Sequence, residues 1–217
     1  MAVMSPDGAW IAGRRCAGRL AAGLLVAVVA FVGACAGGPD APSGTPTPTG
    51  EAPDGSGSPT TELVIWGSVT SLPDGLADVV AAAAGAGHSL ALQDDGTVDA
   101  WGEDLYGQAS PPEGLTGARA VAAGSVHSLA LKEDGTVVAW GRNSRGQSSV
   151  PAGLSDATAI AAGDEHSLAL KRGGTVVGWG WDHRGQSSVP SGLTGVTAIA
   201  AGYQHSLALT EDGTVVA

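Results

Sequence analysis

Aromatic and charged side chains are scarce in this 217-residue chain, at 4% and 14% of its residues. It has only two cysteines, Cys16 and Cys35, and both lie near the N-terminus. The remainder can therefore hold neither a disulfide nor a cysteine metal site. Glycine is abundant instead, with 35 residues. This composition is unusual for a helical enzyme and indicates short β-segments of Ala, Val and Leu joined by tight turns.

Positive charge is also in short supply, because the net charge of the chain is -11. Three of its ten basic residues precede Cys35, so the remainder is more acidic than the whole. An acidic body repels the phosphate backbone of DNA or RNA. We therefore expect no nucleic-acid partner.

The N-terminal segment predicts export and lipidation. Arg14, Arg15 and Arg19 form a basic region ahead of the apolar run "LAAGLLVAVVAFV". That run has the length of a signal-peptide core and is shorter than the roughly 20 residues of a membrane-spanning helix. It ends in "VGAC", which resembles the lipobox of bacterial lipoproteins, and the resemblance implies a lipid on Cys35. We interpret residues 1–35 as a signal peptide with a lipobox; the alternative is an uncleaved signal anchor.

Residues 36–61 read "AGGPDAPSGTPTPTGEAPDGSGSPTT". Pro, Gly, Ser and Thr dominate this stretch, which shows no apolar periodicity, so it is predicted to be a disordered linker. A flexible segment of this length has a root-mean-square reach on the order of 30 Å. Together with the predicted signal peptide and lipobox, this linker indicates a location outside the cytoplasm. We expect a cell-surface or periplasmic lipoprotein that is anchored to the membrane by its lipid alone.

The rest of the chain is one unit written four times. "HSLAL" recurs at a strict period of 39 residues, and Trp-Gly follows thirteen residues after each of the first three histidines. Each unit contains four short β-signals, which in the third unit cover residues 147–151, 158–163, 166–171 and 175–179. Units of this kind in series favour the blades of a β-propeller, with a β-solenoid as the competing architecture.

Side-chain size within the repeat predicts how blades would stack. In a strand reading "HSLAL", His and both Leu face one way, whereas Ser and Ala face the other. A large face on one blade can then nest against a small face on the next, with tryptophans filling the wide gaps. The repeat residues assigned to this scaffold are His88, His127, His166, His205, Trp66, Trp101, Trp140 and Trp179.

The motif "AGxxHSLALxxDGTVxAWGxNxxGQ" closely resembles the repeat of the regulator of chromosome condensation (RCC1) family, and its compact form is similar to bacterial members that include a secreted β-lactamase inhibitor protein. The resemblance implies an all-β, seven-bladed propeller of four-stranded blades over residues 62–217. About four blades fit into that length, so we expect a fragment of the ring; a closed four-bladed ring is the alternative.

Repetition argues against chemistry at the histidines. A catalytic imidazole is needed once, beside a particular nucleophile or acid, whereas these four occupy one position in successive blades. Each is expected to form a hydrogen bond with the backbone at a blade junction. A metal-binding ring of histidines is the alternative, although the spacing offers no tetrahedral set. We therefore expect no enzymatic activity, no cofactor and no metal.

The parts that differ between units predict the binding surface. Strand direction places the "AGxxH" turns and the "WGxxxxGQ" loops on one face, and variable loops on a rigid frame are how propellers build binding sites. The candidate partner-binding residues are Tyr106, Asp164, Glu165, Trp181, Asp182, His183, Arg184, Tyr203 and Gln204.

The leading hypothesis is a non-enzymatic, lipid-anchored, extracytoplasmic propeller that binds a protein partner. The resemblance also implies two alternatives. One is guanine-nucleotide exchange on a small GTPase, as in the family's eukaryotic namesake. The predicted export signal and the acidic body both argue against this alternative. The other is inhibition of a secreted or periplasmic enzyme.

Overall fold

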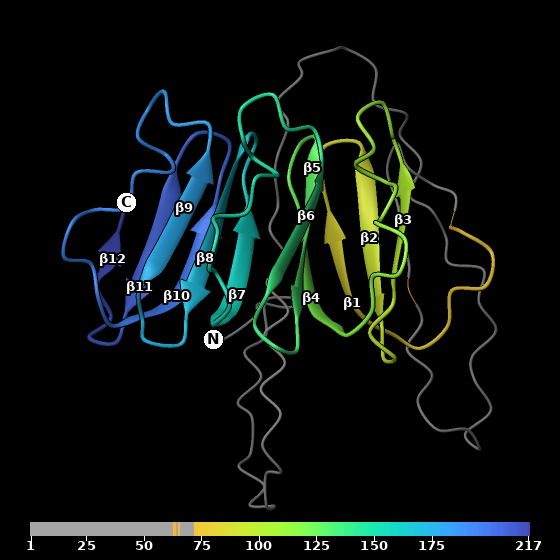
Figure 1. Ribbon diagram of the computed structural model, residues 1–217, viewed down its shortest axis with the longest axis horizontal. Coiled ribbons are helices and arrows are strands. Elements are labelled where there is room, and N and C mark those ends of the chain that lie inside the picture. The colour runs from red at the N-terminus through yellow and green to blue at the C-terminus, as the bar shows by residue number, and fades with distance from the viewer. Residues whose placement is uncertain (1–62, 64, 66–71) are drawn as a thin grey trace, which may run out of the picture.

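The computed structural model describes residues 63, 65 and 72–217, and Figure 1 shows these as four antiparallel sheets standing side by side. Each sheet contains three strands, and we call the sheets the first to fourth blades. Their strands are β1 (Val79–Ala84), β2 (His88–Gln93) and β3 (Val98–Gly102); β4 (Ala118–Ala123), β5 (His127–Lys132) and β6 (Val137–Gly141); β7 (Ala157–Ala162), β8 (His166–Lys171) and β9 (Val176–Gly180); β10 (Val196–Ala201), β11 (Ser206–Thr210) and β12 (Val215–Val216).

The predicted signal peptide with Cys35, the predicted linker and Trp66 lie outside the described residues. Within the part of the chain that the structure does describe, no helix is long and apolar enough to cross a membrane. The all-β fold class and the presence of about four propeller blades agree with the sequence-based prediction.

The number of strands per blade is three, whereas the sequence pattern predicted four. In the third unit, residues 147 and 148 form a turn and residues 149–151 have no regular secondary structure, where the first strand was expected. The amides of Ser149 and Val150 donate hydrogen bonds to the nearby carbonyls of Gly146 and Ser148, and Pro151 has no amide hydrogen to donate. These amides are thus engaged locally, and the carbonyl of Gln147 accepts hydrogen bonds from Ser167 and Trp179 of the third blade.

The large and small faces of neighbouring blades nest as the side-chain pattern indicated. Leu129 and Leu131 of the second blade pack against Ala157, Ala169 and Trp179 of the third blade. The equivalent leucines of the first and third blades pack in the same way on the blades that follow them. Each fully buried leucine contributes about 2 kcal/mol through the area it removes from water, so these interfaces form the core.

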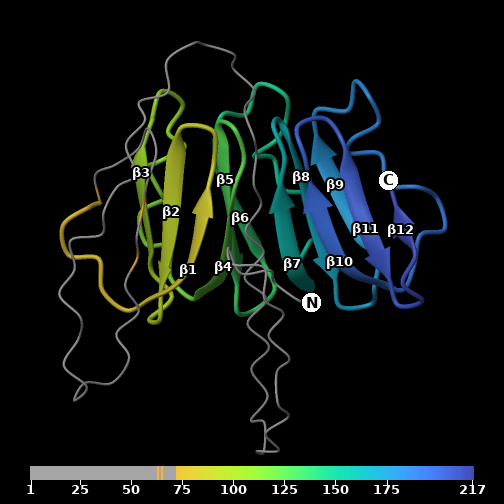
Figure 2. The same ribbon diagram turned by 180° about the vertical axis from the view of Figure 1, so that it is seen from behind.

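Alanine-rich strands form the inner edge of the blades. β1, β4, β7 and β10 lie next to one another, and Figure 2 shows them from the side on which they are in front. They line a shared hollow of about 600 Å³. Small side chains are needed here because the blades converge toward this edge.

The turn between the second and third strands of a blade depends on glycine. Gly135 has a φ of +82°, and a Cβ there would lie 2.7 Å from the carbonyl oxygen of Ser155. The preceding Asp134 accepts a 2.9 Å hydrogen bond from the amide of Thr136 through its Oδ1. In the third blade Gly174 keeps the positive φ, but Gly173 stands where the aspartate would be.

We expect Gly173→Asp to stabilise the protein. The position is open, with no heavy atom within 4 Å of an added Cβ, and the new carboxylate would accept the amide of Thr175 as Asp134 accepts that of Thr136. The substitution also reduces the freedom of the unfolded chain, so the melting temperature should rise by roughly 2 °C. Asp134→Gly, the reverse change in the second blade, should lower it. An unchanged or lower melting temperature in Gly173→Asp would contradict this explanation of the turn.

Candidate functional site

The repeated histidines lie at the blade junctions and point into the next blade. The Nε2 atoms of His88, His127 and His166 lie 2.8, 2.9 and 3.0 Å from the hydroxyl oxygens of Ser128, Ser167 and Ser206. These three imidazoles are 0 to 1% exposed. His205 is exposed, since no later blade covers it among the described residues. The partner is a serine hydroxyl, whereas the sequence predicted a direct bond to the backbone.

Each serine hydroxyl also forms a second hydrogen bond, to a backbone carbonyl, and so links its histidine to that carbonyl. The hydroxyls of Ser128, Ser167 and Ser206 donate to the carbonyl oxygens of Gln108, Gln147 and Gln186, at 2.8, 2.9 and 2.6 Å. A serine has one hydroxyl proton, and the carbonyl takes it. The serine oxygen must therefore accept a hydrogen bond from Nε2–H of the histidine, so the imidazole is the donor in this contact.

The same glutamines also bind the tryptophans and the loops. The indole Nε1 atoms of Trp140 and Trp179 donate to the carbonyls of Gln108 and Gln147 at 3.0 and 2.9 Å. The side chain of Gln147 accepts the amide of Arg145 through its Oε1 at 2.9 Å. Gln108 and Gln186 hold the amides of the equivalent loop residues in the same way. A buried glutamine thus joins two blades and one loop.

Burial keeps the imidazoles uncharged. Loss of contact with water lowers the pKa of His88 to about 4 and that of His127 to about 3, and it also lowers the pKa of His166. A glycine covers each ring: a Cβ on Gly124 would lie 2.4 Å from Cε1 of His127. These histidines are therefore scaffold elements that water and substrates do not reach.

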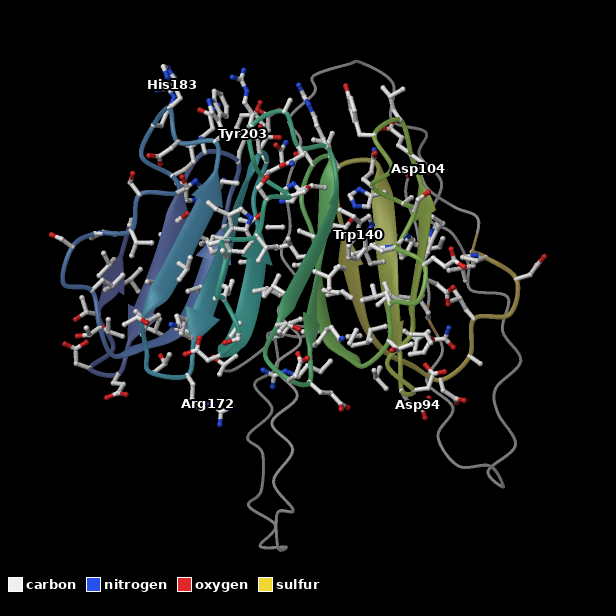
Figure 3. The ribbon with its side chains drawn as sticks, in the orientation of Figure 1. Asp94, Asp104, Trp140, Arg172, His183 and Tyr203 are labelled. Carbon is white, nitrogen blue, oxygen red and sulfur yellow. The ribbon has the colours of Figure 1, made fainter. Side chains whose placement is uncertain are left out.

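The variable turns and loops lie together on one face of the blades. In Figure 3, Asp104, His183 and Tyr203 lie at one end of the sheets, whereas Asp94 and Arg172 lie at the opposite end. This is the division that strand direction predicted. We call the end that carries His183 and Tyr203 the loop face.

A chain of contacts runs across the loop face from the first blade to the third. The guanidinium of Arg142 lies over the ring of Tyr106, 5.1 Å from its centroid, and that of Arg145 lies 5.3 Å from the ring centroid of Trp181. Trp181 stacks on His183 with ring centroids 5.9 Å apart. The four variable residues of the "WGxxxxGQ" loops are 103–106, 142–145 and 181–184. In both cation–π pairs, the last of these four residues in one loop contacts the first in the next loop.

Glu165 connects the two cation–π pairs, because it binds both arginines. Its carboxylate lies 2.9 Å from Nη1 of Arg142 and 3.7 Å from Nε of Arg145. The turn residue next to a scaffold histidine is therefore engaged with the loop of the preceding blade. Four of the sequence-predicted candidates, Tyr106, Glu165, Trp181 and His183, belong to this connected set.

The other predicted candidates lie on the same face outside that set. The carboxylate of Asp182 accepts hydrogen bonds from the amide of Ser187 and the hydroxyl of Ser188, and the bond from Ser188 is the main cause of its lowered pKa. Both hydrogen bonds of this carboxylate therefore lie within the segment that follows the third blade. Asp164 and Gln204 are half-buried, Arg184 is exposed, and Tyr203 is 59% exposed.

Sequence reasoning missed Arg142, Arg145 and Leu105. The arginines occupy the first and last positions of the loop that follows the second blade. At the junction of the second and third blades, the facing loop and turn positions carry opposite charges, those of Arg142 and Glu165. The two neighbouring junctions lack such a pair, so this charge pattern was a sequence signal that could have identified Arg142. Leu105, the chain neighbour of Tyr106, is 81% exposed.

No group of three or more His, Cys, Asp or Glu side chains able to hold a metal ion occurs among residues 63, 65 and 72–217. Repeated three-stranded blades, nested through alternating faces and linked by buried polar bonds, define the class of protein as a β-propeller repeat protein.

The chain belongs to the RCC1 family. The model described as the regulator of chromosome condensation (RCC1) repeat matches slightly more than half of the chain, over residues 79–108, 118–147, 157–186 and 196–217. Each full match begins at the first strand of a blade and ends at the buried glutamine of its loop. A search of the curated proteins finds no match.

Solved structures share the fold. Yeast RCC1 (Prp20) bound to Kap60 is 24% identical, with a TM-score of 0.55, and the match covers 63% of this chain and 42% of that chain. Prp20p from Saccharomyces cerevisiae, studied for its binding to Gsp1p and histones, is also 24% identical, with a TM-score of 0.56 over 63% and 44%. The ectodomain of the receptor kinase CR4 from Physcomitrella patens is 26% identical, with a TM-score of 0.51 over 62% and 39%. The chain thus spans less than half the length of these proteins.

Ser128→Ala should destabilise the junction between the first and second blades. The change leaves Nε2–H of His88 without an acceptor and removes one of the two hydrogen bonds to the Gln108 carbonyl. Stranding buried polar groups costs about 1–3 kcal/mol of unfolding free energy, which urea unfolding measures. Ser191→Ala, at an exposed turn serine, is the matched control and should change the free energy by less than about 0.5 kcal/mol. Equal effects of the two changes would contradict the proposed role of the Ser128 hydroxyl.

Stability should fall with acidification in a window set by the buried histidines. Folding holds His88 and His127 neutral, whereas the unfolded chain binds protons below pH 6.5, so the unfolding free energy decreases as pH falls from 6.5 toward 4 and 3. We expect a loss of at least about 2 kcal/mol between pH 6.5 and 4.5 in urea unfolding. The carboxylates with lowered pKa act in a lower window, below pH 3.8. A flat profile from pH 6.5 to 4.5 would show that the imidazoles are not held neutral by burial.

Proposed function

We propose that this chain is a non-enzymatic, exported and lipid-anchored β-propeller protein that binds another protein through the loop face. The observation that carries the proposal is the connected set from Tyr106 to His183, which spans the loops of three successive blades. Tyrosine, tryptophan and arginine are the residue types that dominate the energy of protein interfaces.

The loop face suits binding because its side chains are held before a partner arrives. Arg142 and Arg145 each contact a ring and share the carboxylate of Glu165, and Gln147 binds the backbone amide of Arg145. A side chain that is already ordered loses less conformational entropy when it binds. Tyr106 and Tyr203 remain 45% and 59% exposed, so they are available for contact.

The proposal of a protein ligand also draws on the solved relatives. Yeast RCC1 (Prp20) was crystallised with Kap60, and Prp20p was studied for its binding to Gsp1p and histones. The absence of enzymatic activity is supported by the histidines: His88, His127 and His166 are buried and already hydrogen-bonded, so they are poor candidates for acid–base chemistry.

Trp181→Ala and Tyr203→Ala should each weaken capture of a partner by the full chain. Truncating an aromatic anchor at the centre of an interface costs about 2 kcal/mol or more, which is a loss of roughly tenfold or more in affinity. Arg172→Ala, on the opposite end of the blades, is the matched control and should capture the same protein undiminished. Pull-down from an extracytoplasmic fraction with quantitative mass spectrometry measures all three. Loss in Arg172→Ala without loss in the aromatic variants would move the site to the opposite face.

Anchoring has its own test. Metabolic labelling with radiolabelled palmitate should mark the wild-type chain and leave Cys35→Ala unlabelled, because Cys35 carries the thiol of the lipobox-like "VGAC". Cys16→Ala, which removes the only other thiol, is the control and should stay labelled. Label retained in Cys35→Ala would overturn the lipid anchor.

A further inference from the structure

The connected set on the loop face carries two cations and one anion, with Asp164 and Asp182 on the same face outside it. Two guanidinium groups, those of Arg142 and Arg145, share the single carboxylate of Glu165. The side chain of Glu165 is 13% exposed, whereas those of Arg142 and Arg145 are 33% and 52% exposed. The carboxylate is therefore covered and the two cations remain accessible, in a protein whose net charge is -11.

Apolar surfaces border these two cations on two sides. On the side of the first blade, Tyr106 lies beneath Arg142 and its chain neighbour Leu105 is 81% exposed. On the side of the third blade, Trp181 lies beneath Arg145 and stacks on His183. The order across the face is therefore aromatic, cationic, aromatic.

We infer that Arg142 and Arg145 form a recognition site for a carboxylate side chain of the protein partner, in an extended segment that places an apolar residue on each side of an Asp or Glu. This inference rests on the proposed function, since it names what the loop face recognises. Guanidinium groups bind carboxylates through paired hydrogen bonds. Tyr106 and Leu105 on one side are 45% and 81% exposed, and Trp181 on the other side is partly exposed, so apolar side chains can contact them.

Glu165 already binds the two guanidinium groups that a partner's carboxylate would bind. A partly exposed ion pair contributes only about 0–1 kcal/mol, so a second carboxylate can take one guanidinium at little cost. The 3.7 Å separation between Arg145 and Glu165 identifies Arg145 as the more loosely held cation. Glu165 thus keeps the cations in position and also competes with the ligand.

The test uses a random peptide library displayed on phage and selected on the immobilised full chain. The enriched peptides should carry Asp or Glu with an apolar residue on either side. One such peptide and its amide counterpart, with Glu replaced by Gln, are then synthesised. The readout is the ratio of their dissociation constants on each variant, which compares two ligands on the same protein and does not depend on its stability.

Wild type should bind the acidic peptide at least tenfold more tightly than the amide peptide. Arg142→Gln/Arg145→Gln should abolish this preference, and Arg142→Lys/Arg145→Lys, which keeps both charges, should retain part of it. Glu165→Gln should increase the preference several-fold, because it removes the competing carboxylate and preserves the shape of the side chain. A merely structural cluster would lose binding in Glu165→Gln as it does in the arginine variants, and that result would overturn the inference.

The inference and the proposed function fail in different ways. Enrichment of neutral or basic peptides whose binding is lost in Trp181→Ala would overturn the carboxylate site and leave the loop face as a protein-binding surface. Acidic peptides that bind Arg142→Gln/Arg145→Gln as well as wild type would also overturn the site. Failure of Trp181→Ala and Tyr203→Ala to weaken capture of the partner would instead remove the proposed function on which the site rests.

Discussion

The backbone carbonyl of a buried glutamine at each blade junction holds this structure in register. At Gln147 it accepts hydrogen bonds from Ser167 and Trp179 of the next blade, while the side chain of the same residue accepts the amide of Arg145. Leucine on alanine packing supplies most of the attraction between blades, but such contacts are not directional. The polar network adds direction, because a hydroxyl and an indole must meet one carbonyl while an imidazole meets that hydroxyl. A residue in the scaffold thereby also fixes the loop that carries the candidate site.

Histidine serves this network as a neutral donor. The hydroxyl of Ser167 gives its single proton to the Gln147 carbonyl, so His127 must offer Nε2–H in return. Burial enforces the same state, because a charged imidazole at this depth loses its hydration. The repeat therefore combines bulk and a hydrogen-bond donor in one side chain, at the cost of sensitivity to acid. The loops beyond the junction are free to vary, and the loop face differs from blade to blade on an unchanging frame.

The repeating local features of the sequence were sufficient for the fold class and the arrangement of the blades. A 39-residue period, alternating large and small faces, and glycines at the turns were all legible from local order. Prediction failed where the chain meets itself at a distance. Residues 147–151 have strand-like composition, but the carbonyl of Gln147 bonds to Ser167 and Trp179 of the next blade instead of to a strand partner. The acceptor of each histidine lies 40 residues away, and the pairing of Arg142 with Tyr106 depends on how successive loops overlap in space. Tyr106, Glu165, Trp181 and His183 were found because they depart from the repeat; the arginines between them were not.

The central claim is that the junction network positions the loop face, and amide hydrogen exchange of Ser167→Ala tests it most directly. Removing the Ser167 hydroxyl loosens Gln147, which holds the amide of Arg145, but leaves Gln108, which holds the amide of Tyr106. The amide of Arg145 should exchange faster than in wild type, and that of Tyr106 should exchange at the wild-type rate. Unaltered exchange at Arg145, or an equal increase at both amides, would contradict the claim.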